Sequence, residues 1–150
     1  MSAVNLDLEI ARFNMIEQQI RPWEVLDPEV LEVLAKVKRE LFVPAAFKAL
    51  AFADLELPIG NGQTMLPPKI DARVLQEVGV RSTDSVLEVG TGSGYMAALL
   101  AAKAEYVFTV EIDPVLAEAA RRNLRLAGIA NVSVEIGDAS RGWSGPSPYD

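Results

Sequence analysis

The sequence contains no cysteine and no histidine. The absence of cysteine excludes a disulfide, a thiolate nucleophile and a zinc–sulfur site. The absence of histidine excludes a Ser-His-Asp triad and most transition-metal sites within this stretch. Chemistry in this chain must therefore rely on carboxylates, hydroxyls, backbone dipoles or a bound cofactor, and we expect no metal site.

Positive charge is also scarce. The 150 residues include 14 Lys and Arg against 21 Asp and Glu, which gives a net charge of −7 and a pI near 4.7. This balance argues against a nucleic-acid partner and against a polybasic membrane surface. No run approaches the roughly 18 apolar residues of a membrane span, and Met1 to Arg12 lacks the pattern of a signal peptide. We expect a cytoplasmic protein.

The N-terminal part of the chain predicts short helices and one irregular loop. Apolar residues at helical spacing indicate a helix that Pro22 ends, and Asp27-Pro28 is typical of a second helix start. A third short helix is expected after Pro44. Leu57 to Pro68, which contains two glycines and three prolines, is interpreted as a loop. Residues 1–68 are thus expected to form a helical segment with this loop.

From Lys69 onward the pattern predicts an α/β domain. After a helix that stops at Gly79, strands at 85–89, 106–110 and 132–136 alternate with helices at 93–103 and 114–127. This order is the signature of one half of a doubly wound, Rossmann-like parallel sheet. Residues 69–150 are expected to be the first half of such a domain.

The end of the sequence predicts a continuation. Tyr149-Asp150 is interpreted as the approach to another strand. A sheet of only three parallel strands would leave its most hydrophobic strand, 85–89, unpaired at an edge, which favours aggregation. We therefore expect the natural fold to be truncated here after its third strand.

A glycine-rich motif stands where the first of these strands turns into a helix. It runs from Glu88 to Gly94, with glycine at 90, 92 and 94. Glycines allow a tight turn and let a ligand approach the main chain, and the following helix N-terminus favours an anionic group. The motif indicates a nucleotide-type cofactor site.

Two cofactor classes fit the motif. Gly92 to Ala97 satisfies G-x-G-x-x-A, as in dinucleotide sites, and Glu111 ends the second strand, where an acid binds ribose hydroxyls in either class. Glu88 before the glycines disfavours a pyrophosphate but suits the cationic amino-acid end of S-adenosylmethionine. Asp138 after the third strand can accept a hydrogen bond from an adenine amino group, or can simply form an Asx turn. The acids favour S-adenosylmethionine over NAD.

These residues carry a resemblance to a known family. From about Phe13 to Asp150 the chain resembles the protein-L-isoaspartate O-methyltransferases, whose fold is that of class I methyltransferases. The Leu57–Thr64 segment is more specific to that family than the glycine motif. The segments that carry the resemblance are Arg39–Pro44, Leu57–Thr64, Val86–Tyr95, Gly137-Asp138, Gly142-Trp143 and Pro148–Asp150.

The resemblance implies a set of cofactor contacts. The glycines would line the cofactor, Glu111 would bind its ribose, Asp138 with Ala139 would hold the adenine, and the 63–65 segment would lie near the methyl group. No catalytic residue is assigned. Together with the glycine motif, the candidate cofactor-binding residues are Gln63, Thr64, Met65, Glu88, Gly90, Thr91, Gly92, Ser93, Gly94, Glu111, Ile112, Asp138 and Ala139.

One position departs from the family pattern. Leu66 stands where the family has a serine taken as catalytic or substrate-positioning, and leucine cannot donate a hydrogen bond to a carboxylate. The acceptor is therefore either an isoaspartyl carboxylate in a protein or peptide, or a small molecule. A non-catalytic cofactor-binding protein is a further alternative. A carboxylate acceptor needs no base, and Glu56 and Asp71 beside this segment are interpreted as solvated surface groups.

Overall fold

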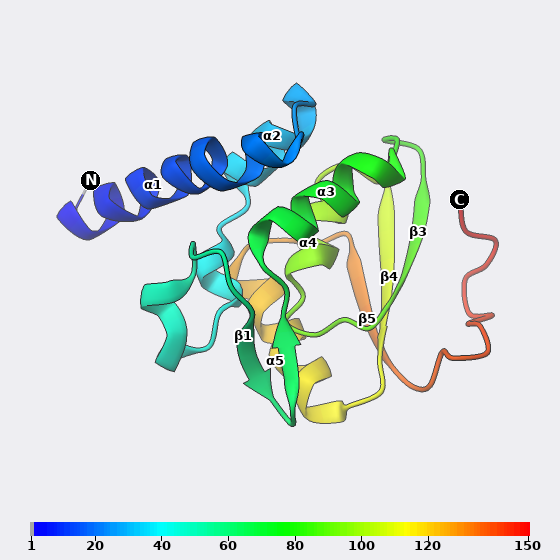
Figure 1. Cartoon of the computed structure of the whole chain (residues 1–150). Coiled ribbons are helices and arrows are strands. Elements are labelled where there is room, and N and C mark those ends of the chain that lie inside the picture. Colours follow the sequence, from blue (N-terminus) through cyan, green and yellow to red (C-terminus); the bar gives the residue numbers. More distant parts are fainter. Residues whose placement is uncertain (1) are drawn as a thin grey trace.

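The computed structural model describes residues 2–150 and shows an α/β fold (Figure 1). The N-terminal region is helical, as predicted. Helix α1 (Ala3–Met15) runs directly into a π-helical turn, Ile16–Ile20, and a 3-10 turn, Arg21–Trp23, so the helical stretch ends just after Pro22 rather than at it. Two further 3-10 segments, Arg39–Phe42 and Ala45–Leu50, precede the first hairpin. The helices are α1 (Ala3–Met15), α2 (Pro28–Lys36), α3 (Pro68–Val78), α4 (Tyr95–Ala101) and α5 (Pro114–Leu126). The strands are β1 (Leu57–Gly60), β2 (Gln63–Met65), β3 (Ser85–Val89), β4 (Tyr106–Glu111) and β5 (Val132–Ile136).

A three-stranded parallel sheet organises the second part of the chain. Its order is β3-β4-β5, with Val89 beside Val110 and Glu111 beside Ile136, so the carboxyl ends of all three strands meet at one edge. Figure 1 shows α3, α4 and α5 on the same side of this sheet. The predicted strands and the βαβαβ order are confirmed. The placement of the helices also agrees, because one half of a doubly wound fold has its helices on one face of the sheet.

The helix boundaries follow ordinary capping chemistry. Asp27 and Asp113 accept hydrogen bonds from backbone N–H groups of α2 and α5, with proline in each first turn. Gly79 ends α3 in the left-handed conformation, as predicted. The helix expected from residue 93 begins at Tyr95 because Gly94, at φ +89°, is the turn residue before it.

One hydrophobic core joins the N-terminal helices to the α/β part. Ile20 and Leu34 from the first segment are buried in the same cluster as Leu75, Tyr95 and Leu99. No helix within residues 2–150 has the length and apolar character needed to cross a bilayer. The division of the chain at residue 68 stays a prediction.

The expected loop at Leu57–Pro68 is wrong in its first part. β1 and β2 pair as an antiparallel hairpin, with Leu57 opposite Met65. Asn61 and Gly62 both have positive φ, as the favoured two-residue hairpin turns require. The Asn-Gly pair was the available signal, and Pro58 is tolerated because this strand is at an edge.

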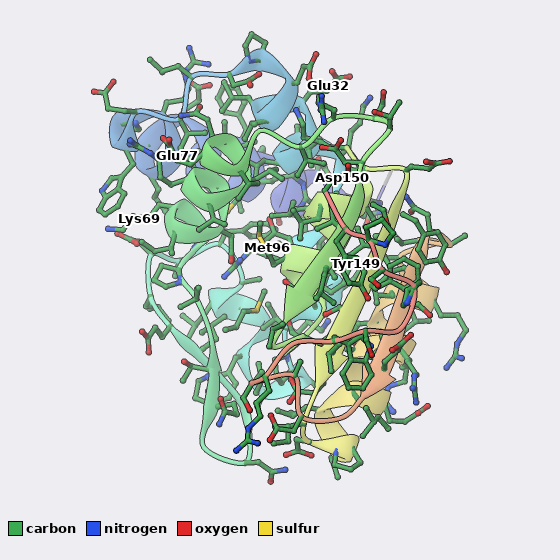
Figure 2. The ribbon with its side chains drawn as sticks, turned by 90° about the vertical axis from the view of Figure 1, so that its right-hand side faces the viewer. Glu32, Lys69, Glu77, Met96, Tyr149 and Asp150 are labelled. Carbon is green, nitrogen blue, oxygen red and sulfur yellow. The ribbon has the colours of Figure 1, made fainter. Side chains whose placement is uncertain are left out.

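The last residues lie beside the free edge of β3. The Asp150 N–H donates to the Ser85 carbonyl at 2.9 Å, and the Ser85 N–H donates to Asp150 Oδ2 at 2.8 Å. Figure 2 shows Tyr149 and Asp150 alongside the sheet, and the Tyr149 ring lies 6.0 Å from the Phe108 ring. Strand β3 thus has one strand neighbour, β4, and this C-terminal segment on its other side.

Candidate functional site

A cavity of about 180 Å³ lies at the carboxyl end of β3, between the glycine motif, the end of β2 and α3. This is the edge at which parallel α/β sheets bind their ligands. Its walls combine backbone from the glycine motif with apolar and carboxyl side chains. The lining residues are Thr64, Met65, Leu66, Asp71, Val74, Glu88, Gly90, Thr91, Gly92, Ser93, Tyr95 and Met96.

The three glycines of the motif have different roles. Gly90, at φ +95°, has open space where a side chain would be, so backbone conformation rather than crowding requires glycine there. A Cβ at Gly92 would lie 3.4 Å from Ile59 of the hairpin. A Cβ at Gly94 would lie 3.4 Å from Ala120 of α5, so Gly94 permits helix packing and does not line the cavity.

Glu111 braces the glycine motif from the end of β4. Its Oε1 accepts the Gly92 N–H at 2.9 Å, and its Oε2 accepts the Asp113 N–H at 3.1 Å. A carboxylate has about four acceptor positions, so two remain for a ligand. This geometry fits an acid that holds ribose hydroxyls while fixing the loop beside them.

Glu88 ends a short chain of hydroxyl groups. The Thr109 hydroxyl donates to Glu88 Oε1 at 2.6 Å and lies 2.6 Å from the Thr91 hydroxyl. Since Thr109 gives its one proton to Glu88, Thr91 must donate to Thr109. Burial, with the nearby charges of Asp71 and Glu111, raises the pKa of Glu88 to about 8. A cationic ligand beside Glu88 would favour its ionised form.

Asp71 is not the solvated surface group that the sequence suggested. It is buried on the inner face of α3 and its carboxyl group lines the cavity. Arg39, which is fully buried, donates to Asp71 Oδ2 at 3.2 Å. Burial raises the pKa of Asp71 to about 6, against the lowering effect of Arg39. Glu56 is exposed, as expected, and accepts a weak bond from Thr64 at 3.4 Å.

The sheet edge beyond Glu111 offers an apolar shelf. Val89, Ile112 and Ile136, at or just after the ends of the three strands, are 59%, 68% and 45% exposed. Asp138 follows them and accepts the Ser140 N–H at 2.9 Å, the Asx-turn contact, which lowers its pKa. Ala139 beside it is buried. These groups together offer exposed apolar side chains with a carboxylate beside them.

The cavity therefore gathers part of the predicted set. Of the candidates it includes Thr64, Met65, Glu88, Gly90, Thr91, Gly92 and Ser93. Glu111, Ile112, Asp138 and Ala139 lie along the sheet edge, whereas Gln63 is exposed on the hairpin opposite Gly60 and does not line the cavity. The sequence interpretation missed Asp71, Val74, Tyr95 and Met96. A helical spacing signal was present for Asp71, because it falls on the stripe of Pro68, Ala72 and Leu75.

The fold and the glycine motif at the sheet edge are those of an α/β domain of the class I methyltransferase kind. A solved protein-L-isoaspartate O-methyltransferase matches it with a TM-score of 0.73 at 27% identity, over 95% of this chain and 45% of that one. A solved Plasmodium falciparum protein in complex with S-adenosyl-L-homocysteine has the same fold, with a TM-score of 0.66 at 19% identity, over 85% and 61% of the two chains.

Sequence comparison identifies the family. The family model for protein-L-isoaspartate (D-aspartate) O-methyltransferase matches residues 11–150. The protein-L-isoaspartate O-methyltransferase of Methanoculleus marisnigri is 45% identical over 139 residues, which are 93% of this chain and 63% of that protein. The chain belongs to the protein-L-isoaspartate O-methyltransferase family. It spans less than two thirds of the length of this relative.

Proposed function

We propose that this protein binds S-adenosylmethionine and transfers its methyl group to an oxygen acceptor. The observation that carries the proposal is the acid-lined cavity beside a glycine motif that Glu111 braces. The S-adenosylmethionine sulfonium and ammonium are cationic. Asp71 is ionised at neutral pH, and a cation beside Glu88 would favour the ionised form of that carboxyl group too. No basic side chain of residues 2–150 lines the cavity. The family membership and the bound S-adenosyl-L-homocysteine named for the Plasmodium protein support the same cofactor.

The cavity is large enough for only part of the cofactor. A cavity of about 180 Å³ is smaller than the roughly 300–1,000 Å³ of pockets that enclose a whole ligand of this size. It suits the amino-acid and methyl end, near Thr64 and Met65. The ribose would then lie at Glu111, and the adenine on the shelf of Ile112 and Ile136, with Asp138 at its exocyclic amine.

When bound, the cofactor would supply a methyl group that is activated by its bond to a positively charged sulfur. The protein's own contribution is to bind, orient and shield. Hydrogen bonds from Gly92 to Glu111 and from Thr109 to Glu88 fix the groups that meet the cofactor before it arrives. Such preorganisation matters because orientation alone can supply roughly 7–11 kcal/mol of a barrier.

For the acceptor, the relatives' name favours an L-isoaspartyl carboxylate in a damaged protein, so that the reaction would serve protein repair in the cytoplasm. The alternative is a different, small-molecule acceptor, and Leu66 in the cavity wall favours it. The test is transfer of a labelled methyl group from S-adenosylmethionine to an isoaspartyl peptide by the full-length protein. Incorporation of label supports the repair assignment, and label that enters only other acceptors rejects it.

A further inference from the structure

Arg39 lies behind the cavity wall with its side chain fully buried. Such a guanidinium is stable only when its donors are matched. Nε donates to the Ala51 carbonyl at 2.7 Å, Nη2 to the Leu66 carbonyl at 2.8 Å and Nη1 to Asp71 Oδ2 at 3.2 Å. Leu66 and Asp71 both line the cavity, so Arg39 holds two parts of its wall at once.

The Arg39 side chain is fixed against the helix that follows the glycine motif. Its guanidinium carbon lies 4.7 Å from the centroid of the Tyr95 ring, a cation–π contact, and Tyr95 is the first residue of α4. Phe42, from the same 3-10 segment as Arg39, packs against that ring with 5.6 Å between the centroids. Because a guanidinium directs its donors in a rigid planar fork, these contacts set the directions of its three bonds. Arg39 therefore links the glycine motif to α3 and to the end of β2.

Asp71 is held by one oxygen and open at the other. Its Oδ2 accepts from Arg39, whereas Oδ1 accepts no hydrogen bond within residues 2–150 and belongs to a side chain that lines the cavity. Lys69, on the same helix, pairs instead with Asp54 at 3.1 Å. Figure 2 shows Lys69 on the outer side of α3 and Met96 on the side that faces the sheet. The Asp71 carboxylate thus has one oxygen fixed by Arg39 and one free for a ligand.

Asp71 is the ionised acid of the cavity before a ligand binds. Burial raises its pKa to about 6 and Arg39 opposes this rise, so the carboxyl group is charged at neutral pH. Burial, with the charges of Asp71 and Glu111, raises the pKa of Glu88 to about 8, so Glu88 is mostly protonated there. Tyr95 stays neutral because burial raises its pKa to about 12. A cation that enters the cavity therefore meets the charge of Asp71 first.

We propose that Asp71 Oδ1 binds the ammonium group of the cofactor's amino-acid end, and that Arg39 is the positioning residue that holds Asp71 for this contact. The inference rests on the proposed binding of S-adenosylmethionine and adds a binding residue on α3, outside the glycine motif. A hydrogen bond between an ammonium and a carboxylate is about twice as strong as one between neutral groups. Arg39 does not line the cavity, so it acts on the ligand through Asp71.

The test compares two ligands on the full-length protein. They are S-adenosyl-L-homocysteine and its deamino analogue, in which hydrogen replaces the amino group. The analogue keeps the adenosine, the sulfur and the carboxylate, so the two ligands differ only in the ammonium contact. Calorimetry at pH 7.5 gives each dissociation constant. We expect the wild type to bind S-adenosyl-L-homocysteine at least tenfold more tightly than the analogue.

Two variants assign this preference to Asp71 and Arg39. Asp71→Asn should weaken the binding of S-adenosyl-L-homocysteine at least tenfold and that of the analogue less than twofold. Arg39→Lys keeps the positive charge but not the three directed bonds. It should weaken S-adenosyl-L-homocysteine at least threefold and the analogue less than twofold, with no further effect when it is added to Asp71→Asn. Glu77→Gln, on the exposed side of the same helix, should change neither affinity.

Three outcomes would overturn the proposal. They are equal affinities of the wild type for the two ligands, an unchanged affinity for S-adenosyl-L-homocysteine in folded Asp71→Asn, and equal losses for both ligands in Arg39→Lys. The last result would mean that Arg39 only supports the fold. If Asp71→Asn does not fold, Arg39→Lys with the two ligands decides. Failure of S-adenosyl-L-homocysteine to bind the wild type would instead reject the proposed function itself.

Discussion

Replacing Glu88 by glutamine is expected to stabilise the ligand-free protein. The pKa of Glu88 is raised from 4.5 to about 8 in the fold, so the folded state holds its proton more tightly than the unfolded state does. The stability that this proton contributes is fully present below about pH 4.5 and is lost as the pH rises to about 8. Glutamine keeps the size and the oxygen that accepts from Thr109, without the charge.

The magnitude follows from the size of the pKa change. Each unit of pKa difference corresponds to about 1.4 kcal/mol. Relative to its value below pH 4.5, the free energy of unfolding of the wild type should therefore fall by about 4 kcal/mol at pH 7.5 but by only about 1 kcal/mol at pH 5. The advantage of Glu88→Gln in free energy of unfolding should therefore grow by about 3 kcal/mol between pH 5 and pH 7.5.

Urea denaturation at the two pH values measures this difference. Glu77→Gln is the matched control, because Glu77 is exposed and its ion pair with Arg73 lies on the surface. Its effect should be below about 1 kcal/mol at both pH values. A Glu88→Gln variant whose stability relative to wild type is the same at pH 5 and pH 7.5 would refute the reasoning.

Three further outcomes are expected. Affinity for S-adenosyl-L-homocysteine, measured by calorimetry, should rise from pH 6 to pH 8, because Glu88 ionises beside the cationic ammonium of the ligand. Glu88→Gln should flatten this rise, and a wild-type affinity that does not change with pH would contradict the reasoning. Gly137→Ala places a Cβ 2.6 Å from the Trp143 ring, so thermal denaturation should show a loss of about 1–3 kcal/mol that Trp143→Ala relieves; no loss contradicts it. Arg39→Met leaves Asp71 unpaired and should cost about 3–5 kcal/mol in urea denaturation. Arg73→Met, at a half-exposed surface ion pair, should cost less than about 1 kcal/mol, and equal effects of the two variants would contradict the reasoning.

The parallel sheet and the glycine motif were predictable because their signals are local. The mostly apolar segment Ser85–Val89 fits a strand of a parallel sheet, and the glycine cluster directly after it fits a strand-to-helix turn. The acids at the strand ends then follow, since the carboxyl ends of parallel strands lie at one edge. The candidate residues Glu88, Glu111 and Asp138 lie at that edge for this reason.

The buried ion pairs were not predictable from local pattern. Arg39 and Asp71 are 32 residues apart, and Arg12 and Glu40, also buried, are 28 apart. A charged residue on a helix is ordinarily exposed, and only the position of its partner in the fold reverses that expectation. The acid that faces the cavity was therefore interpreted as surface, although its place on the inner stripe of α3 was visible in the spacing.

Two local signals in the β1–β2 hairpin predict different structures. Prolines at 58, 67 and 68 favoured an irregular loop, while the Asn61-Gly62 pair favoured a tight turn. The turn prevails because Pro58 lies in a strand with one free edge, where a missing N–H costs no ladder bond. The hairpin then brings Ile59 against Gly92 and Asn61 into a hydrogen bond with Asp113, at the rim of the site.

The central claim is that this chain is built to bind S-adenosylmethionine. Calorimetric titration of the protein with S-adenosyl-L-homocysteine and, separately, with NAD tests it most directly. We predict saturable binding of S-adenosyl-L-homocysteine and no binding of NAD. Glu111→Ala should abolish the former, because that carboxylate braces Gly92 and is the group that we propose to bind the ribose. Binding of NAD in its place, or S-adenosyl-L-homocysteine binding that Glu111→Ala leaves intact, would contradict the account.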